Sequence, residues 1–296
     1  MFHDVIIIGG SYAGLSAGLP LARARRRVLV IDAGQRRNRF AATSHGFLTQ
    51  DGISPDEIAA DGRAQLMNYD TVDWHHANVV SAERDGEGFC VTDGYDKQHR
   101  ASVLILASGV VDELPAIPGL AERWGTQVFH CPYCHGYELQ QGRIGVLATS
   151  QLSMHHALML PDWGTTTLLL NDAFTPSSDE LAQLVKRGTS LERTAVVRLD
   201  GGEPLDVQLQ DGRSLAFDGI FVAPRMHLSP LVTQLGCEVE EGPLGSFIKT
   251  DPTKATSVPG VFACGDTARA AGSVPLAVGD GAMAGVGAHR ALMFGV

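Results

Sequence analysis

Residues 5–14 read Val5-Ile6-Ile7-Ile8-Gly9-Gly10-Ser11-Tyr12-Ala13-Gly14. The β-branched run is typical of a parallel strand buried on both faces, and the glycines suit a sharp turn into a helix. We expect that helix over 15–24 and a second strand over 27–31, closed by Asp32. Strand, glycine turn, helix, strand and acid together are the fingerprint of a dinucleotide-binding βαβ unit.

Each position of the fingerprint has a physical role. Gly9 permits the turn, Gly14 lets helix and strand pack closely, and Asp32 can accept hydrogen bonds from ribose hydroxyls. The helix N-terminus offers free N–H groups to a pyrophosphate. Ser11 stands where a middle glycine is usual, but its side chain is small enough for close backbone approach. The alternative is an ordinary βαβ turn that happens to contain glycines.

The chain continues with a loop over 35–57, which is long enough to suggest a functional role. A helix is expected over 55–68, and strands over 79–83, 88–92 and 103–107, the first two forming a hairpin. The Pro/Gly-rich stretch 115–119 predicts the first domain crossover.

A second βαβ unit follows, with a strand over 143–148, a helix over 151–160 and a strand over 165–170. A strand ending in Gly265-Asp266 and a Gly/Ala-rich helix over 275–292 then rejoin the first domain. The predicted fold class is α/β with two Rossmann-like domains. The first is discontinuous, over residues 1–113 and 242–296, and the second, over 114–241, is inserted into it.

The hexapeptide Cys131-Pro132-Tyr133-Cys134-His135-Gly136 is the clearest chemical signal. Its two cysteines can form a disulfide or lie reduced side by side. Pro132 suits the first turn of a helix, whose N-terminus would stabilise a thiolate, and His135 can exchange a proton near neutral pH. This favours redox chemistry.

Two other interpretations of the hexapeptide remain. A zinc site would need further ligands, and the pairs His75-His76 and His155-His156 lack the usual spacing, so no metal is predicted. A purely structural disulfide is disfavoured, because so short a loop constrains the unfolded chain little.

Composition narrows the class of protein. A net charge of −10 argues against a nucleic-acid surface. Five cysteines, an odd number, do not suggest a secreted disulfide framework, and Cys90, Cys237 and Cys264 are expected to be core thiols. With no leader-like segment and no apolar run of membrane-spanning length, we expect a soluble, cytoplasmic protein.

These landmarks, in this order, resemble the low-molecular-weight thioredoxin reductases. They resemble more closely the thioredoxin-reductase-like dithiol oxidases that form disulfides in natural products such as gliotoxin and holomycin. The resemblance covers nearly the whole chain and implies a non-covalent FAD. The implied FAD-binding residues are Gly9, Gly10, Ser11, Ala13, Gly14, Asp32, Ala107, Gly109, Gly265, Asp266, Leu276 and Ala277.

The resemblance also implies roles for the residues of the redox centre. Cys134 would face the flavin, and Cys131 would exchange with substrate. His135 stands where reductases usually carry an aspartate, as in the oxidase branch. His130 is an alternative proton-handling residue. A homodimer is expected from the resemblance alone.

The second domain departs from the reductases in two places. Residues 145–151 read Gly-Val-Leu-Ala-Thr-Ser-Gln, without the glycine-rich turn that binds NADPH. Residues 169–172 read Leu-Leu-Asn-Asp, without the arginines that grip a 2′-phosphate, and Asp172 would repel one. The sequence therefore predicts that the nicotinamide site is lost.

The functional hypothesis is an FAD-dependent oxidase that converts a dithiol, expected to be a small molecule, into a disulfide. Molecular oxygen would be the electron acceptor and hydrogen peroxide the product. One alternative is a disulfide reductase supplied by NADPH or another electron donor. Another, of a different class, is a flavin-binding regulatory protein without turnover.

Overall fold

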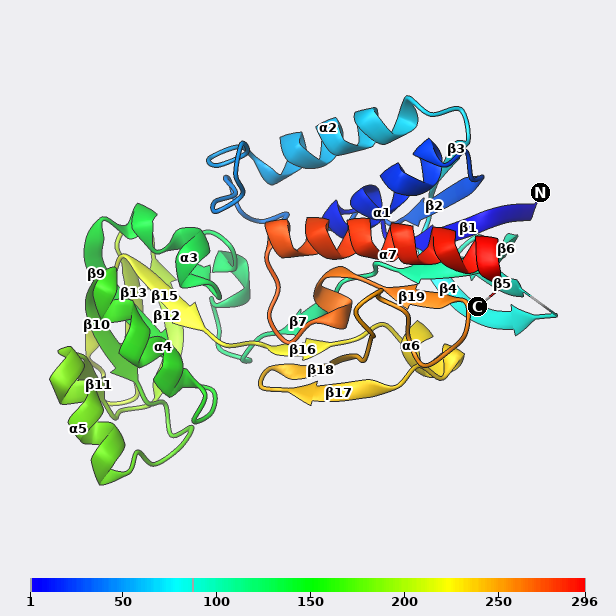
Figure 1. Ribbon diagram of the computed structural model, residues 1–296. Helices are drawn as coiled ribbons and strands as arrows, with labels where there is room; N and C mark the ends of the chain where they lie inside the picture. Colours follow the sequence, from blue (N-terminus) through cyan, green and yellow to red (C-terminus); the bar gives the residue numbers. More distant parts are fainter. Residues whose placement is uncertain (1, 87, 296) are drawn as a thin grey trace. The chain divides into compact units, whose positions relative to one another are not determined.

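The computed structural model describes residues 2–86 and 88–295. Its contacts divide the chain into two compact units (Figure 1). Unit 1 comprises Met1–Arg39, Phe47–Val111 and Met226–Val296, and unit 2 comprises Phe40–Gly46 and Asp112–Arg225. Both units are α/β, which confirms the predicted fold class of a discontinuous Rossmann-like domain carrying an inserted second one.

The main sheet of unit 1 has the strand order β3-β2-β1-β6-β5-β4, with β19 also paired to β6. Strands β1, β2, β3, β6 and β19 run parallel, whereas β4, β5 and β6 form an antiparallel meander. The strands are β1 (Phe2–Ile8), β2 (Val28–Asp32), β3 (Val72–His76), β4 (Val79–Asp85), β5 (Gly88–Asp93), β6 (Gln98–Leu106) and β19 (Val261–Ala263). A small antiparallel ribbon joins β17 (Val239–Gly242) to β18 (Gly245–Ile248).

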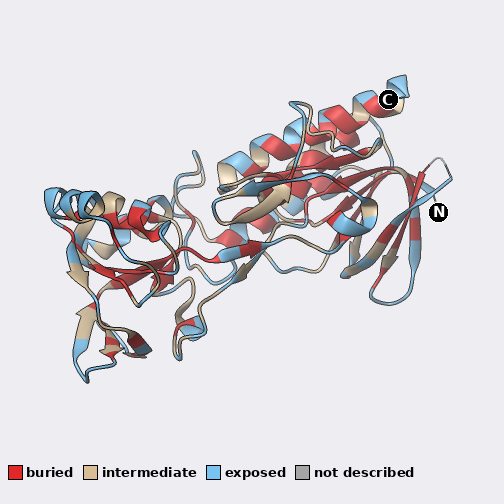
Figure 2. Cartoon of the chain, turned by 90° about the horizontal axis from the view of Figure 1, so that it is seen from below, coloured by how far each residue is buried: buried red, intermediate tan, exposed pale blue. Residues whose placement is uncertain are grey.

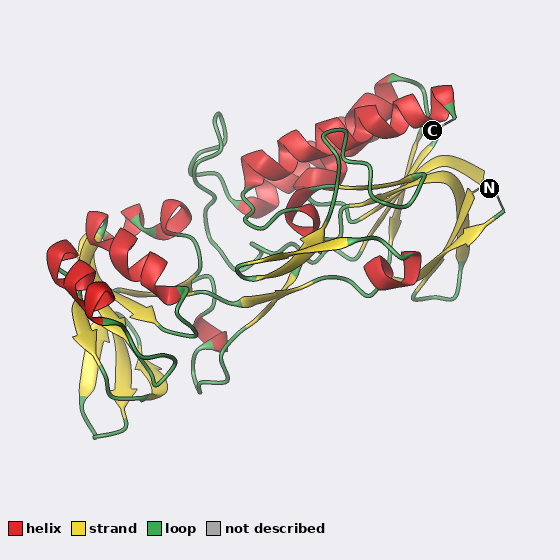
Figure 3. Ribbon diagram, turned by 60° about the horizontal axis from the view of Figure 1, so that its bottom comes forward, coloured by secondary structure: helices red, strands yellow, loops and turns green. Residues whose placement is uncertain are grey.

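The helices of unit 1 are α1 (Tyr12–Arg23), α2 (Pro55–Met67), α6 (Leu231–Leu235) and α7 (Val274–Phe294), with a 3₁₀ turn η4 (Gly265–Ala268). Helices α1 and α7 lie side by side along the sheet (Figures 1 and 3). Their contact depends on missing side chains, because a Cβ on Gly281 would lie 2.1 Å from the Ala13 carbonyl oxygen. A Cβ on Gly285 would lie 2.3 Å from that of Ala17.

Two apolar clusters cover the two faces of this sheet, and the central strands are buried along most of their length (Figure 2). Val5 and Ile7 of β1 join the cluster beneath α1 and α7, whereas Ile6 and Ile8 join the cluster that includes the β4–β6 meander. Burial on both faces explains why the continuous β-branched run predicts this strand so well.

Unit 2 has a parallel sheet of order β11-β10-β9-β15-β8 and a separate antiparallel sheet of order β12-β13-β14. The strands are β8 (Val128–Phe129), β9 (Gln141–Leu147), β10 (Gly164–Leu169), β11 (Ser190–Glu192), β12 (Val196–Gly201), β13 (Leu205–Leu209), β14 (Ser214–Phe217) and β15 (Gly219–Val222). The helical segments are η1 (Ala121–Arg123), α3 (Pro132–His135), η2 (Tyr137–Leu139), α4 (Ser153–Met159), η3 (Leu160–Asp162) and α5 (Ser178–Arg187). The chain crosses between the units at β7 (Val111–Glu113) and β16 (Arg225–His227).

The return to unit 1 comes earlier than the sequence indicates. The sequence assigns residues 226–241 to the second domain, whereas the contacts assign them to unit 1. The reason lies in α6, whose Leu231 and Val232 pack with Ile6 and Phe89 in the core of the first sheet. The first crossover, placed between 113 and 114 from sequence, falls between 111 and 112.

Several elements have no counterpart among the predicted ones, and strand β3 and the sheet β12-β13-β14 are two of them. Strand β3 reads Val-Asp-Trp-His-His, which has neither an apolar run nor a clear alternation. Within residues 2–86 and 88–295, no helix combines the length and the apolar character needed to cross a membrane.

Candidate active site

The glycine turn after β1 has the geometry that the fingerprint demands. Gly9 adopts φ +102°, and a Cβ there would lie 2.3 Å from the Ala107 carbonyl oxygen. A Cβ on Gly14 would lie only 1.9 Å from the Gly9 carbonyl oxygen, so helix α1 must carry a glycine at this point. The Gly10 N–H donates to Asp32 Oδ1 at 2.9 Å, which places the acid beside the turn.

The N-terminus of α1 is suited to an anion. Ser11 is its N-cap residue, but no side chain of the described part of the chain caps the helix, and its first turn carries no acid. Uncapped N–H groups at a helix N-terminus attract phosphate through hydrogen bonds and the helix dipole. The glycine turn and the start of α1 therefore fit the pyrophosphate of a dinucleotide, and Asp32 fits its ribose.

The second predicted motif of unit 1 lies against the first. Gly265 has φ +75°, and a Cβ there would lie 2.8 Å from the Ala13 Cβ. Asp266 accepts a hydrogen bond from Arg37 Nη1 at 2.8 Å, and both side chains are mostly buried. A Cβ on Gly272 would lie 1.8 Å from Asp266 Oδ1, so the chain passes directly over this carboxylate.

The remaining predicted cofactor residues differ in their surroundings. Ala277 is buried in the first turn of α7, whereas Leu276 is 43% exposed. Gly109 has φ +65°, and a Cβ there would meet nothing within 4 Å, so it is not part of the close-packed turn. Which of these residues touch a cofactor stays a prediction.

Sequence reasoning missed two residues of this region. Arg37 belongs to the long loop over 35–57 that the sequence marks as functional, but its pairing with Asp266 was not foreseen. Trp74 lies on β3, and a Cβ on Gly10 would lie 2.3 Å from its ring. The Trp74 Nε1 is buried without a hydrogen-bond partner among the described residues, and buried donors of this kind usually have a partner, so an acceptor of a bound cofactor would fit here.

In unit 2, Cys131 and Cys134 form a disulfide with their Cα atoms 5.3 Å apart. Cys131 is the N-cap residue of the short helix α3, and Pro132 occupies its first turn, as expected from the sequence. The other three cysteines, Cys90, Cys237 and Cys264, are free and buried, which confirms them as core thiols. Burial raises the pKa of Cys264 to about 12, so this thiol is unsuited to exchange.

The glycine of the hexapeptide is required by packing. A Cβ on Gly136 would lie 2.6 Å from both the Pro132 carbonyl oxygen and Trp163 Cδ1. The Trp163 ring also meets the ring of Tyr133 edge-on at 5.3 Å. Trp163, which lies outside the hexapeptide, therefore packs against the short helix α3 and limits how it can move.

His135 is buried in surroundings that favour its neutral form. Its ring stacks on Phe129 at 4.5 Å, and both ring nitrogens are buried without a hydrogen-bond partner within the described residues. Burial lowers its pKa, a neighbouring Glu138 opposes this, and His45 reinforces it. A neutral imidazole with free nitrogens can accept a proton from a thiol.

The alternative base, His130, lies near a second histidine. The rings of His130 and His156 meet edge-on at 5.9 Å. Burial, with smaller contributions from His130 and His155, lowers the pKa of His156 to about 4. His156 is thus neutral over the physiological range, and the sequence had indicated it only as an unsuitable zinc ligand.

Several polar groups that follow β9 and β10, where a nucleotide would bind in unit 2, are bonded to the protein's own groups. After β9 the Thr149 N–H donates to Ser153 Oγ at 3.1 Å, and the Leu152 N–H donates to Ser150 Oγ. After β10 the Asn171 side chain accepts from the Val196 N–H at 2.9 Å. Close by, Gln151 donates to Glu180, a carboxylate that would repel phosphate.

The comparisons with known proteins agree with this geometry. Residues 3–281 match the family described as pyridine nucleotide-disulphide oxidoreductase. A thioredoxin reductase named tcpT from Claviceps purpurea is 32% identical over 98% of this chain and 94% of its own length. The crystal structure of an oxidoreductase from Agrobacterium tumefaciens is 55% identical, with a TM-score of 0.96 over 99% of both chains. The crystal structure of HlmI is 37% identical, with a TM-score of 0.92 over 98% of this chain and 92% of its own.

The chain therefore belongs to the pyridine nucleotide-disulphide oxidoreductase family. Within that family it is thioredoxin-reductase-like, and the resemblance inferred from the sequence is confirmed.

Proposed function

We propose that this protein is an FAD-dependent dithiol oxidase, which converts a small-molecule dithiol and oxygen into a disulfide and hydrogen peroxide. The supporting observation is a contrast within one chain. The redox disulfide Cys131–Cys134 and the neutral His135 are present, whereas polar groups at the ends of β9 and β10, where a nucleotide would bind, are bonded within the protein.

The fit of unit 1 to a dinucleotide supports FAD as the cofactor. Gly9, Gly10, Ser11 and Gly14 would hold its pyrophosphate, and Asp32 would hold the adenosine ribose. Asp266, already oriented by Arg37, would meet the ribityl hydroxyls. When bound, FAD would supply the means of moving an electron pair from the cysteines to oxygen.

The protein's own residues account for the thiol chemistry. A substrate thiolate attacks Cys131, forms a mixed disulfide, and releases Cys134 as a thiolate. The second substrate thiol gives its proton to His135 and attacks the substrate sulfur that is bound to Cys131. The product disulfide then leaves, and Cys131 and Cys134 remain as the reduced pair.

The test is an anaerobic titration of the purified protein. We expect a yellow protein that releases FAD on denaturation, and we expect dithiothreitol, as a simple dithiol, to bleach the flavin without any nicotinamide. Admitting air should restore the colour and yield one hydrogen peroxide per dithiol oxidised. A protein that stays colourless after FAD is added, or a flavin that dithiols do not bleach, would contradict the proposal.

The pH dependence tests the role of His135. Because burial lowers its pKa below the ordinary 6.5, His135 should stop acting as a base only when the pH drops below that lowered value. His135→Ala should slow turnover by about 10²–10⁴-fold at neutral pH. The deficit should shrink above about pH 8.5, where substrate thiols ionise unaided.

The control for this variant is His155→Ala, which removes an exposed histidine of the same unit. It should leave both rate and pH profile unchanged. A His135→Ala deficit that is equal at pH 6 and pH 9 would show that His135 is not the base.

A second candidate is a disulfide reductase supplied by NADPH, favoured because the relative tcpT is named a thioredoxin reductase and because the family is described by a pyridine nucleotide. The two candidates differ in the direction of electron flow and are separated by the nicotinamide experiment set out in the Discussion.

A further inference from the structure

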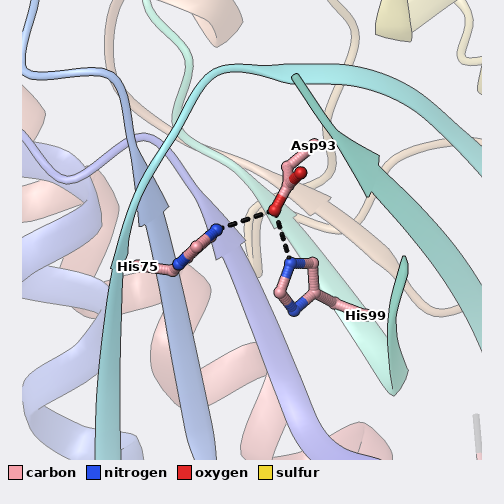
Figure 4. A group of neighbouring side chains, drawn as sticks. All are labelled: His75, Asp93 and His99. Atoms are coloured by element: carbon pink, nitrogen blue, oxygen red, sulfur yellow. Dashed lines mark hydrogen bonds and ion pairs between the residues drawn. The ribbon is translucent and has the colours of Figure 1, made fainter. Parts of the chain in front are cut away.

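Two histidines and an aspartate converge in unit 1, from three different strands (Figure 4). His75 lies on β3, Asp93 ends β5, and His99 lies on β6. The Nε2 atoms of His75 and His99 lie 2.7 and 2.9 Å from the same oxygen, Asp93 Oδ2. The candidate ligand atoms of the three residues all lie within 4.8 Å of one another.

The aspartate of this cluster is held rigidly. Its other oxygen, Oδ1, accepts hydrogen bonds from the N–H groups of Tyr95 at 2.9 Å and Lys97 at 3.1 Å. The Asp93 side chain is fully buried, and that of His99 is 7% exposed. In the metal sites of proteins, hydrogen bonds from neighbouring groups commonly hold the metal-binding carboxylate in its orientation.

His75, the third residue of the cluster, leaves one side of it open to solvent. The His75 side chain is 27% exposed, in contrast to its two partners. In Figure 4 both imidazole rings direct a nitrogen toward the Asp93 carboxylate. An ion could therefore enter past His75 and keep a water molecule on that side.

We propose that His75, Asp93 and His99 form a binding site for one divalent transition-metal ion, with zinc the best match. Two imidazole nitrogens, one carboxylate oxygen and one water are a tetrahedral zinc set. Magnesium and calcium prefer oxygen ligands throughout, so two imidazoles disfavour them.

The distances from the two imidazole nitrogens to Asp93 Oδ2 are compatible with zinc binding after a small shift. Zinc bonds of about 2.0–2.2 Å at tetrahedral angles separate neighbouring ligand atoms by roughly 3.3 Å. The two nitrogens would have to move away from Asp93 Oδ2 by roughly half an ångström, a shift that small rotations of the two imidazole rings provide. The ion would also compensate a buried carboxylate, whose ion pairs among the described residues are with these two histidines.

A metal ion bound at this site would stabilise the folded protein against unfolding. It would tie β3, at the edge of the parallel part of the sheet, to the β5–β6 hairpin of the meander. A ligand that binds the folded state alone stabilises it by mass action. The site is independent of the proposed dithiol chemistry, so either proposal can fail without the other.

The experiment uses the full-length, air-oxidised, FAD-loaded protein after removal of metals with a chelator. Titration with ZnCl₂ in a calorimeter should show one zinc per chain, and the midpoint of thermal unfolding should rise. His75→Ala should weaken binding by about tenfold or more, since ligands matter at least as much as their outer-shell partners. His76→Ala should bind as the wild type does, because its side chain points to the opposite face of the same strand.

In the zinc titration, the proposal is overturned by no zinc uptake by the wild-type protein or by unchanged uptake by His75→Ala. If His75→Ala fails to fold, cobalt(II) on the wild-type protein decides. Bands of tetrahedral cobalt at wavelengths beyond the flavin absorption, without thiolate-to-metal transitions, support the site. Absence of such bands, or bands typical of cysteine ligands, overturns it.

Discussion

Cys131→Ser and Cys134→Ser are each expected to abolish dithiol oxidation while the protein keeps its flavin. The two cysteines form the disulfide at the start of α3, and without either one no covalent relay remains. The loss should far exceed the roughly 10²–10⁴-fold effect typical of a removed general base. Oxygen consumption in the presence of dithiothreitol measures the turnover.

The two serine variants should differ in their absorption spectra. If Cys134 faces the flavin, Cys131→Ser leaves a thiolate there and should show a long-wavelength absorption band that Cys134→Ser lacks. Tyr133→Phe is the matched control, because it changes an exposed side chain inside the same hexapeptide. A band only in Cys134→Ser would reverse the two roles, and full activity in either serine variant would refute the relay.

NADPH and NADH are expected to leave the flavin oxidised under anaerobic conditions. The amides at Thr149 and Leu152 are already bonded to serine hydroxyls, so neither of these two donors is free for a pyrophosphate. At the end of β10 stand Asn171 and Asp172 in place of arginine, and an acid repels a 2′-phosphate. Absorbance of the flavin, followed in a stopped-flow instrument, is the measurement.

The matched control is dithiothreitol at the same concentration, which should bleach the flavin under the same conditions. Rapid, stoichiometric bleaching by either nicotinamide at micromolar concentration would instead identify the protein as a reductase. That result would contradict the oxidase proposal but would not affect the disulfide relay, because both functions use it.

The sequence predicted those parts of the fold where one local signal dominates. Strand β1, its glycine turn and α1 follow from a β-branched run and from glycines that packing makes obligatory. The hexapeptide likewise indicated its own disulfide and the helix that begins at Pro132. In both places the responsible residues are neighbours along the chain.

The sequence was insufficient where distant residues decide the structure. The boundary at α6 depends on Leu231 and Val232 joining a core formed by the first strands of the chain. The cluster of His75, Asp93 and His99 has sequence separations of 18 and 6 that match no ligand motif. Trp163, which packs on Gly136, gave no signal at all before the fold brought the two residues together.

The contact between α1 and α7 determines when α1 can reach its final packing during synthesis. Helix α1 leaves the ribosome before its partner glycines, Gly281 and Gly285, have been added to the chain. At about 5–20 residues per second, the helix that carries the dinucleotide turn waits until all the residues in between have been synthesised before its packing partner exists. The inserted unit, whose last residue is Arg225, is by then fully synthesised. Helix α1 thus acquires this neighbour only after a whole second unit has been made.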